Sequence, residues 1–241
     1  MKKQSEKNMQ NPNEEVQNKV GFEEESNIEQ ILKKYKNQVI IGVVAVVVIV
    51  LLSVFLFNSN TKKSEEASLL LSRILPYYEQ GAYDVSLNGD KKIDVRGQSL
   101  KGLIYIVNEY KSTEAGKLAA LYTGSALVNL HKYQEATEYF DIAMDNASKV
   151  VKQGASAGMG QIKEYEKNYK EASDYYLKAS DFAIDNEIKA QYTLYSAICL
   201  EKAQDKNNAE KQYKIVLNLA PNSEYSEFAK EGLTRLGIVI D

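Results

Sequence analysis

The sequence predicts an all-α protein in which a single N-terminal transmembrane helix is followed by a solenoid of helical repeats. Three observations lead to this prediction: one long uncharged apolar segment, apolar residues at helical spacing over most of the remainder, and a motif that recurs every 36 or 37 residues. Runs that alternate with period 2, which would indicate strands, are almost absent. The 241 residues provide room for one domain of ordinary size or two small ones.

Residues 1–38 precede the apolar segment and divide into two parts. Residues 1–26 are rich in Asn, Gln, Lys and Glu, with little apolar surface to bury, so we expect a disordered cytoplasmic tail. Residues 27–38 place Ile28, Ile31 and Leu32 at helical spacing, which predicts an amphipathic lead-in helix.

The predicted transmembrane helix covers residues 39–57, VIIGVVAVVVIVLLSVFLF. Its 19 residues carry no charge, and at about 1.5 Å per residue they reach roughly 28 Å, close to the thickness of the hydrocarbon core. Lys and Arg near its two ends are almost evenly divided, so the positive-inside rule gives only a weak preference. Because domain-sized C-terminal segments translocate largely regardless of charge, we expect a cytoplasmic N-terminus and an extracytoplasmic C-terminal domain.

A divergent helix pair with a connecting loop is predicted over residues 58–115, with its helices at residues 64–80 and 100–110. The connection DVSLNGDKKIDV partly matches a calcium-binding loop, but Val95 stands where the bidentate Glu is needed. We therefore interpret its Asn-Gly step as a turn in a loop.

Three helix-turn-helix units are predicted over residues 116–225. They align through YQEATEYFDIA, YKEASDYYLKA and NNAEKQYKIV, whose first alanines are 36 and 37 residues apart. Small residues let two helices approach closely, and an aromatic four residues after each of these alanines fills the gap to the next pair. The residues expected at the packing positions are Gly124, Ala136, Ala143, Gly160, Ala172, Ala179, Ala209 and Pro221. A capping helix and tail follow over residues 226–241.

The order of these residues resembles the tetratricopeptide repeat, a unit of about 34 residues. That family has a small residue on the first helix, an aromatic at the turn, and an alanine and a second aromatic on the second helix. The aromatic positions hold Tyr133 and Phe140 in the first unit and Tyr169 and Tyr176 in the second. In the third unit Lys206 replaces the turn aromatic.

The resemblance implies a concave groove that binds peptide segments and is lined by the first helix of each unit. The positions that it places there are Leu121, Ser125, Val128, Ala157, Gln161, Glu164, Leu194, Ile198 and Glu201. Such a groove is part aliphatic and part acidic, and it lacks the Lys/Arg clamp that would hold a C-terminal carboxylate. The alternative is that these side chains are only solvated, or partly covered by the N-terminal helix pair.

Composition excludes most catalytic chemistry that uses imidazole or thiolate. The chain has one His and one Cys, too few within one chain for His-based triads, His/Cys zinc sites or disulfides. We interpret His131 as a solvated turn residue, Cys199 as a small buried core residue, and most tyrosines as core residues. The net charge of -3 lacks the basic surplus of a nucleic-acid-binding protein. We expect no enzyme, cofactor, metal, nucleic acid or small-molecule substrate.

The order of parts, a short tail, one uncleaved span and a small repeat domain, resembles the bacterial ancillary subunit of the Sec translocon and its membrane-anchored relatives. The likeness covers residues 28–237 and includes the segment from Ser86 to Leu127 that joins the first helices. It implies a scaffold in the bacterial inner membrane that binds protein partners at the extracytoplasmic face, namely the translocon or a periplasmic chaperone. The alternative is a structural organiser of cell-envelope assembly or cell division.

Overall fold

Helices dominate the part of the chain that the computed structural model describes, residues 46–49, 61–95 and 97–239. The chain divides into two units, Met1–Asn58 and Ser59–Asp241. All helices and strands discussed below belong to the second unit.

The predicted N-terminal segments fall mostly outside the described residues. This applies to the tail over 1–26, the lead-in helix over 27–38 and most of the transmembrane helix over 39–57, of which only residues 46–49 are described and are helical. None of the described helices combines the length and the apolar character that crossing a membrane requires.

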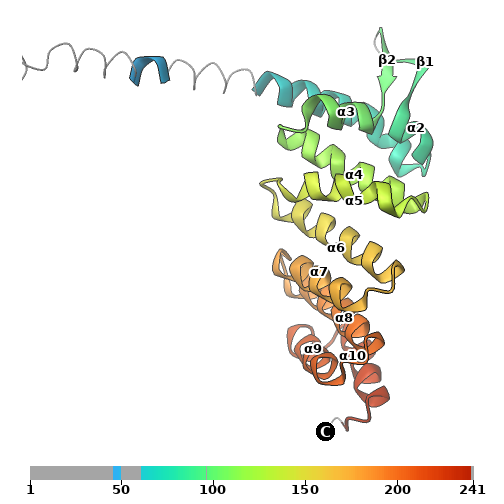
Figure 1. The fold of residues 1–241 in the computed structure, drawn as a ribbon, viewed down its shortest axis with the longest axis vertical. Coiled ribbons are helices and arrows are strands. Elements are labelled where there is room, and N and C mark those ends of the chain that lie inside the picture. The colour runs from blue at the N-terminus through green and yellow to red at the C-terminus, as the bar shows by residue number, and fades with distance from the viewer. Residues whose placement is uncertain (1–45, 50–60, 96, 240–241) are drawn as a thin grey trace, which may run out of the picture. The chain divides into compact units, whose positions relative to one another are not determined.

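The second unit starts with a helix over residues 61–79, followed by a small helix-and-hairpin segment and then by helices alone. The small segment consists of α2 (Tyr83–Asn88), β1 (Gly89–Val95), β2 (Gln98–Lys101) and α3 (Leu103–Tyr110). The helices that follow are α4 (Glu114–Asn129), α5 (Tyr133–Met144), α6 (Lys149–Tyr165), α7 (Tyr169–Asp181), α8 (Asn186–Lys202), α9 (Lys206–Leu219) and α10 (Glu224–Arg235). From α3 on, each helix packs against the next in chain order (Figure 1). The predominantly helical fold is confirmed.

A β-hairpin lies within the predicted loop of this otherwise helical fold. Strand β1 pairs with β2 in antiparallel fashion, with Gly89 opposite Lys101 and Val95 opposite Gln98. The Asn-Gly step ends α2 and begins β1, so its interpretation as a loop turn was wrong. Gly89 has a φ of 73°, in the left-handed region, and a Cβ there would overlap the Leu100 carbonyl. Only glycine fits at this change from helix to strand.

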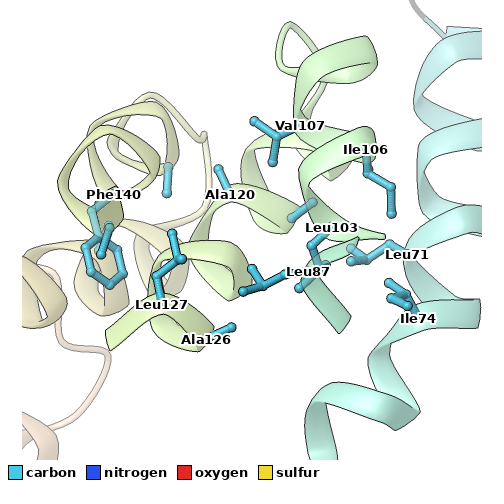
Figure 2. Packing of buried hydrophobic residues seen from close by; sticks show 14 of the residues in the cluster. Leu71, Ile74, Leu87, Leu103, Ile106, Val107, Ala120, Ala126, Leu127 and Phe140 are labelled. Atoms are coloured by element: carbon cyan, nitrogen blue, oxygen red, sulfur yellow. The ribbon is translucent and has the colours of Figure 1, made fainter. Parts of the chain in front are cut away.

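The N-terminal core joins the helix over 61–79 to α3 and α4. Leu71 and Ile74 project from that helix toward Leu103 and Ile106 of α3, and all four are at most 4% exposed (Figure 2). Full burial of such side chains stabilises a fold by about 1.5–3 kcal/mol each. The predicted helix pair is therefore present, although the hairpin separates its members.

One aromatic residue in each repeat fills the space between successive helices. Phe140 of α5 is 1% exposed; a Cβ placed on Gly124 of α4 would lie 2.8 Å from its ring, and one on Gly158 of α6 would overlap it. Tyr176 of α7 meets Gly160 of α6 in the same way, at 2.9 Å. The predicted packing alanines, Ala136, Ala143, Ala172, Ala179 and Ala209, are all 0% exposed.

The turn inside each repeat has the same left-handed backbone conformation. His131, Lys167 and Gln204 have φ values of 59°, 61° and 60°, and each lies two residues before the second helix of its repeat. Left-handed conformations favour Gly, and the three units all use other residues.

Side-chain caps begin four of the described helices, α4, α8, α9 and α10. Thr113 accepts a hydrogen bond from the Gly116 backbone N–H, and Asp185 accepts one from that of Ile188. Ser223 caps α10, which begins two residues before the predicted capping helix. The packing position predicted for Pro221 was wrong, because Pro221 is exposed in the turn just before α10. Each cap satisfies a backbone donor that the first helical turn leaves free.

Candidate functional site

An open groove with a volume of about 870 Å³ runs along the first helices of the repeats. Its walls come mainly from the end of the helix over 61–79 and from α4, α6 and α8, and the turn before α5 and side chains of α5 and α7 complete them. Small residues on α6, namely Gly154, Ala157 and Gly158, line part of it.

The structure brings six of the nine predicted groove residues together along this groove. They are Ser125, Val128, Ala157, Gln161, Glu164 and Ile198. Gln161 is exposed, whereas Val128 is only 7% exposed. All six lie on α4, α6 and α8, the first helices of the three repeats, as the repeat positions indicate.

The other three predicted residues lie elsewhere. Leu194 is 2% exposed and packs in the core that α8, α9 and α10 share. Leu121 packs against α6, where a Cβ on Gly154 would lie 3.2 Å from its methyl groups. Glu201 is held between two side chains of later helices. All three face a neighbouring helix instead of the groove. A helix that packs between two others buries residues on both sides, so only part of its surface is left to line the groove.

Aromatic side chains form much of the groove wall, and the assignment of most tyrosines to the core missed them. The aromatic lining residues are Tyr78, Tyr133, Phe140, Tyr176, Tyr192 and Tyr195. Tyr195 is 36% exposed, and it meets Tyr176 and Tyr192 edge to face at centroid distances of 5.5 and 6.0 Å. The spacing of Tyr192 and Tyr195 by three on one helix was the available signal, since it places both on one face.

The groove tyrosines carry hydroxyl groups with spare hydrogen-bonding capacity. Tyr195 accepts a hydrogen bond of 3.1 Å from Gln191 Nε2, which leaves its own proton to donate. Tyr133 shares a bond of 3.1 Å with Nδ1 of His131. In the described part of the chain, Tyr192 Oη makes no hydrogen bond. Burial raises the pKa of Tyr78, against the opposing effect of a hydrogen bond with Ser125, so it stays a neutral phenol at physiological pH.

The groove is almost free of net charge, unlike the partly acidic groove that the sequence predicts. Glu164 is the one carboxylate among the described lining residues, which include no Lys or Arg. Tyr176 donates a hydrogen bond of 3.1 Å to its Oε2, and Lys202 donates one of 2.6 Å to its Oε1. The hydrogen bond to Glu164 raises the pKa of Lys202 despite burial, so the pair is a neutral unit.

The second predicted carboxylate is also engaged. Tyr213 donates a hydrogen bond of 2.5 Å to Oε2 of Glu201, and Arg235 binds both oxygens at 2.9 and 3.0 Å. These bonds, that of Arg235 above all, lower the pKa of Glu201 although burial opposes the shift. Glu201 therefore links α8, α9 and α10.

No metal-binding cluster of three or more His, Cys, Asp or Glu side chains occurs in the part of the chain that the structure describes. His131 lies at the exposed turn, as predicted, and its ring also contacts that of Tyr133. Cys199 is 1% exposed, which confirms the predicted buried position. Burial raises the pKa of its thiol to about 12.

No family model and no curated protein matches the sequence.

Proposed function

We propose that this chain is a membrane-anchored, non-catalytic scaffold whose groove binds a segment of a partner protein. The observation that carries the proposal is the groove itself: half-exposed tyrosines over a floor of Gly and Ala residues on α6. Protein interfaces are enriched in tyrosine, and residues that dominate binding energy often lie in such pockets. Small floor residues let a peptide backbone approach the helices closely.

The uncharged segment over 39–57 supports a membrane anchor, and the length of the following domain supports an extracytoplasmic location. By resemblance to the ancillary subunit of the Sec translocon, we propose the translocon or a periplasmic chaperone as the partner at the bacterial inner membrane. Alkaline phosphatase fused to the C-terminus should be active in intact cells. Activity of a C-terminal fluorescent-protein fusion combined with an inactive phosphatase fusion would reverse the proposed orientation.

Site-specific crosslinking tests whether the groove binds protein. A photo-crosslinking amino acid at Gln161, an exposed lining residue, should form adducts with a discrete set of partner proteins in cells. The matched control carries it at Phe228 of α10, which is 50% exposed and does not line the groove. Equal adduct patterns from both positions would contradict binding in the groove.

The identity of the adducts separates the two proposed roles. Translocon subunits or periplasmic chaperones captured from Gln161 would support the scaffold at the secretion site. Envelope-assembly or division proteins captured there would support the alternative, a structural organiser, for which the same groove and anchor serve equally well.

A further inference from the structure

We infer that the groove selects a proline-rich segment of its partner in the polyproline II conformation. This inference rests on the proposed function, in which the groove binds a partner segment, and it specifies the chemistry of that segment. Three features of the lining residues support it: their aromatic rings, their hydrogen-bonding groups and their charge.

The aromatic rings suit proline side chains. Tyr78, Tyr192 and Tyr195 reach the groove from two separate walls, the end of the helix over 61–79 and α8. Each of the three already makes edge-to-face contacts with a neighbouring tyrosine, which fixes its ring plane. Fixed, half-exposed aromatic rings are the surface against which proline-rich segments dock in other recognition modules.

The hydrogen-bonding groups suit a backbone that offers acceptors and few donors. Tyr192 and Tyr195 each have a hydroxyl proton that bonds to nothing else in the described part of the chain, and the exposed Gln161 adds an amide. A polyproline II segment leaves its carbonyl groups unbonded, and its prolines have no N–H. The strongest acceptor in the groove, Glu164, is already occupied by Tyr176 and Lys202. A strand-like ligand, whose many N–H groups need acceptors, should therefore bind more weakly.

The charge of the groove selects an uncharged segment. With Glu164 paired and no Lys or Arg among the described lining residues, a charged ligand side chain would lose water without gaining a partner. The same reasoning disfavours a free C-terminal carboxylate. An internal proline-rich stretch meets all three requirements, and because it is already extended before binding it loses little conformational entropy.

Peptide binding to the full-length chain in detergent micelles tests the inference. The probe is a fluorescein-labelled decaproline with blocked ends, followed by anisotropy. The controls are a blocked Gly-Ser peptide of equal length and a decaproline that ends in Asp residues with a free carboxylate. We expect saturable binding of the blocked decaproline, and at least about tenfold weaker binding of either control.

Variants locate the binding site. Tyr195→Ala should weaken binding of the blocked decaproline by about tenfold or more, because it removes an exposed ring from the wall. Tyr192→Phe keeps the ring and removes only the hydroxyl, so its smaller loss would reveal the hydrogen bond to the peptide. Phe228→Ala removes an aromatic outside the groove that is even more exposed, at 50% against 36% for Tyr195, and should leave binding unchanged.

The outcomes separate this inference from the function on which it rests. Decaproline binding no tighter than Gly-Ser binding, together with partner adducts at Gln161 in cells, would overturn the proline preference and leave the scaffold role standing. The absence of both would overturn both. Binding that Phe228→Ala weakens as much as Tyr195→Ala does would place the peptide outside the groove and overturn the inference.

Discussion

Tyr213 donates its hydroxyl hydrogen to Oε2 of Glu201, which lies twelve residues earlier on the preceding helix, at 2.5 Å. Tyr176 stands in the same relation to Glu164, also twelve residues earlier, at 3.1 Å. In both repeats the aromatic side chain that fills the space between helices is thus bound to a carboxylate. Because a buried phenol without a partner would cost stability, the two residue types depend on one another.

In the first repeat, both the hydroxyl group and the carboxylate are absent. Its interhelical aromatic is Phe140, which has no hydroxyl group, and the residue twelve positions earlier is Val128. Val128 is 7% exposed and needs no polar partner. The stacked pair Tyr133 and Tyr165, with ring centroids 3.9 Å apart, joins this repeat to the next.

The Glu201 network predicts a destabilised Glu201→Gln variant. The amide keeps an acceptor for Tyr213 but loses the charge that binds Arg235 at two oxygens. We expect the free energy of unfolding to fall by about 1 kcal/mol at neutral pH. Charge-assisted hydrogen bonds can contribute more, but this site is partly solvated. Urea unfolding of the purified protein, followed by circular dichroism, measures it.

The same variant tests the pH dependence of stability. The pKa of Glu201 lies below its ordinary value of 4.5 in the folded protein, so its contribution is present above pH 4.5 and is lost as the pH falls through the lower folded value. The difference between wild type and Glu201→Gln should therefore shrink as the pH falls below 4.5. An equal difference at neutral and acidic pH would show that lost packing, not charge, destabilises the variant.

Two glycines on one helix, α6, should respond oppositely to alanine. Gly158→Ala places a methyl group against the buried Phe140 ring and should destabilise the protein by about 1–3 kcal/mol. Gly154→Ala meets only the flexible end of Leu121 at 3.2 Å; higher helix propensity should offset that contact and stabilise by up to about 1 kcal/mol. Thermal unfolding of both variants measures the two effects. Similar shifts of the melting temperature for both variants would contradict this account of repeat packing.

The helical repeat was predictable because its signal is local. Small residues and aromatics recur at fixed positions, and each sits in the same kind of contact in the structure, as Gly124 and Gly160 do beneath Phe140 and Tyr176. The hairpin was not predictable in this way. Strand β1 is GDKKIDV, in which only Ile93 and Val95 alternate as a strand would, and its partner lies beyond a turn. Pairing between strands, not composition, stabilises it.

The groove was predictable in position but only partly in its residues. Repeat positions indicate which helices line it, yet α8 carries apolar residues on more than one face. Leu194 and Ile198 are one turn apart on it; the first is buried in the core and the second lines the groove. Which face of α8 is open depends on how α9 and α10 pack against it, and this long-range packing also decides that Tyr192 and Tyr195 reach the groove.

The left-handed turn inside the second repeat predicts a stabilising substitution. Lys167 is exposed and has a φ of 61°, a conformation that costs a side-chain-bearing residue about 1–2 kcal/mol. Lys167→Gly should remove this cost and raise the free energy of unfolding by about 0.5–1 kcal/mol after the extra entropy of the unfolded chain is subtracted. Lys167→Ala is the control, since it keeps a Cβ and should gain nothing. Equal effects of Gly and Ala would trace the change to the lysine charge.

The position of Cys199 predicts a thiol that is inert until the repeats separate. It packs with Ala172 and Tyr176 between α7 and α8, and burial, reinforced by the charge of Glu164, raises its pKa to about 12. Because the thiolate is the reactive form, a thiol-specific reagent at mildly alkaline pH should not label the native protein. In urea the same reagent should label one thiol per chain, the number of cysteines in the sequence.

A Glu231→Cys variant is the positive control. Because position 231 is exposed, its added thiol should react at once in the native state. Rapid labelling of Cys199 in the native protein would mean that α7 and α8 separate locally. Because α8 also carries Tyr192 and Tyr195, the groove would then be less rigid than the contacts between these rings imply.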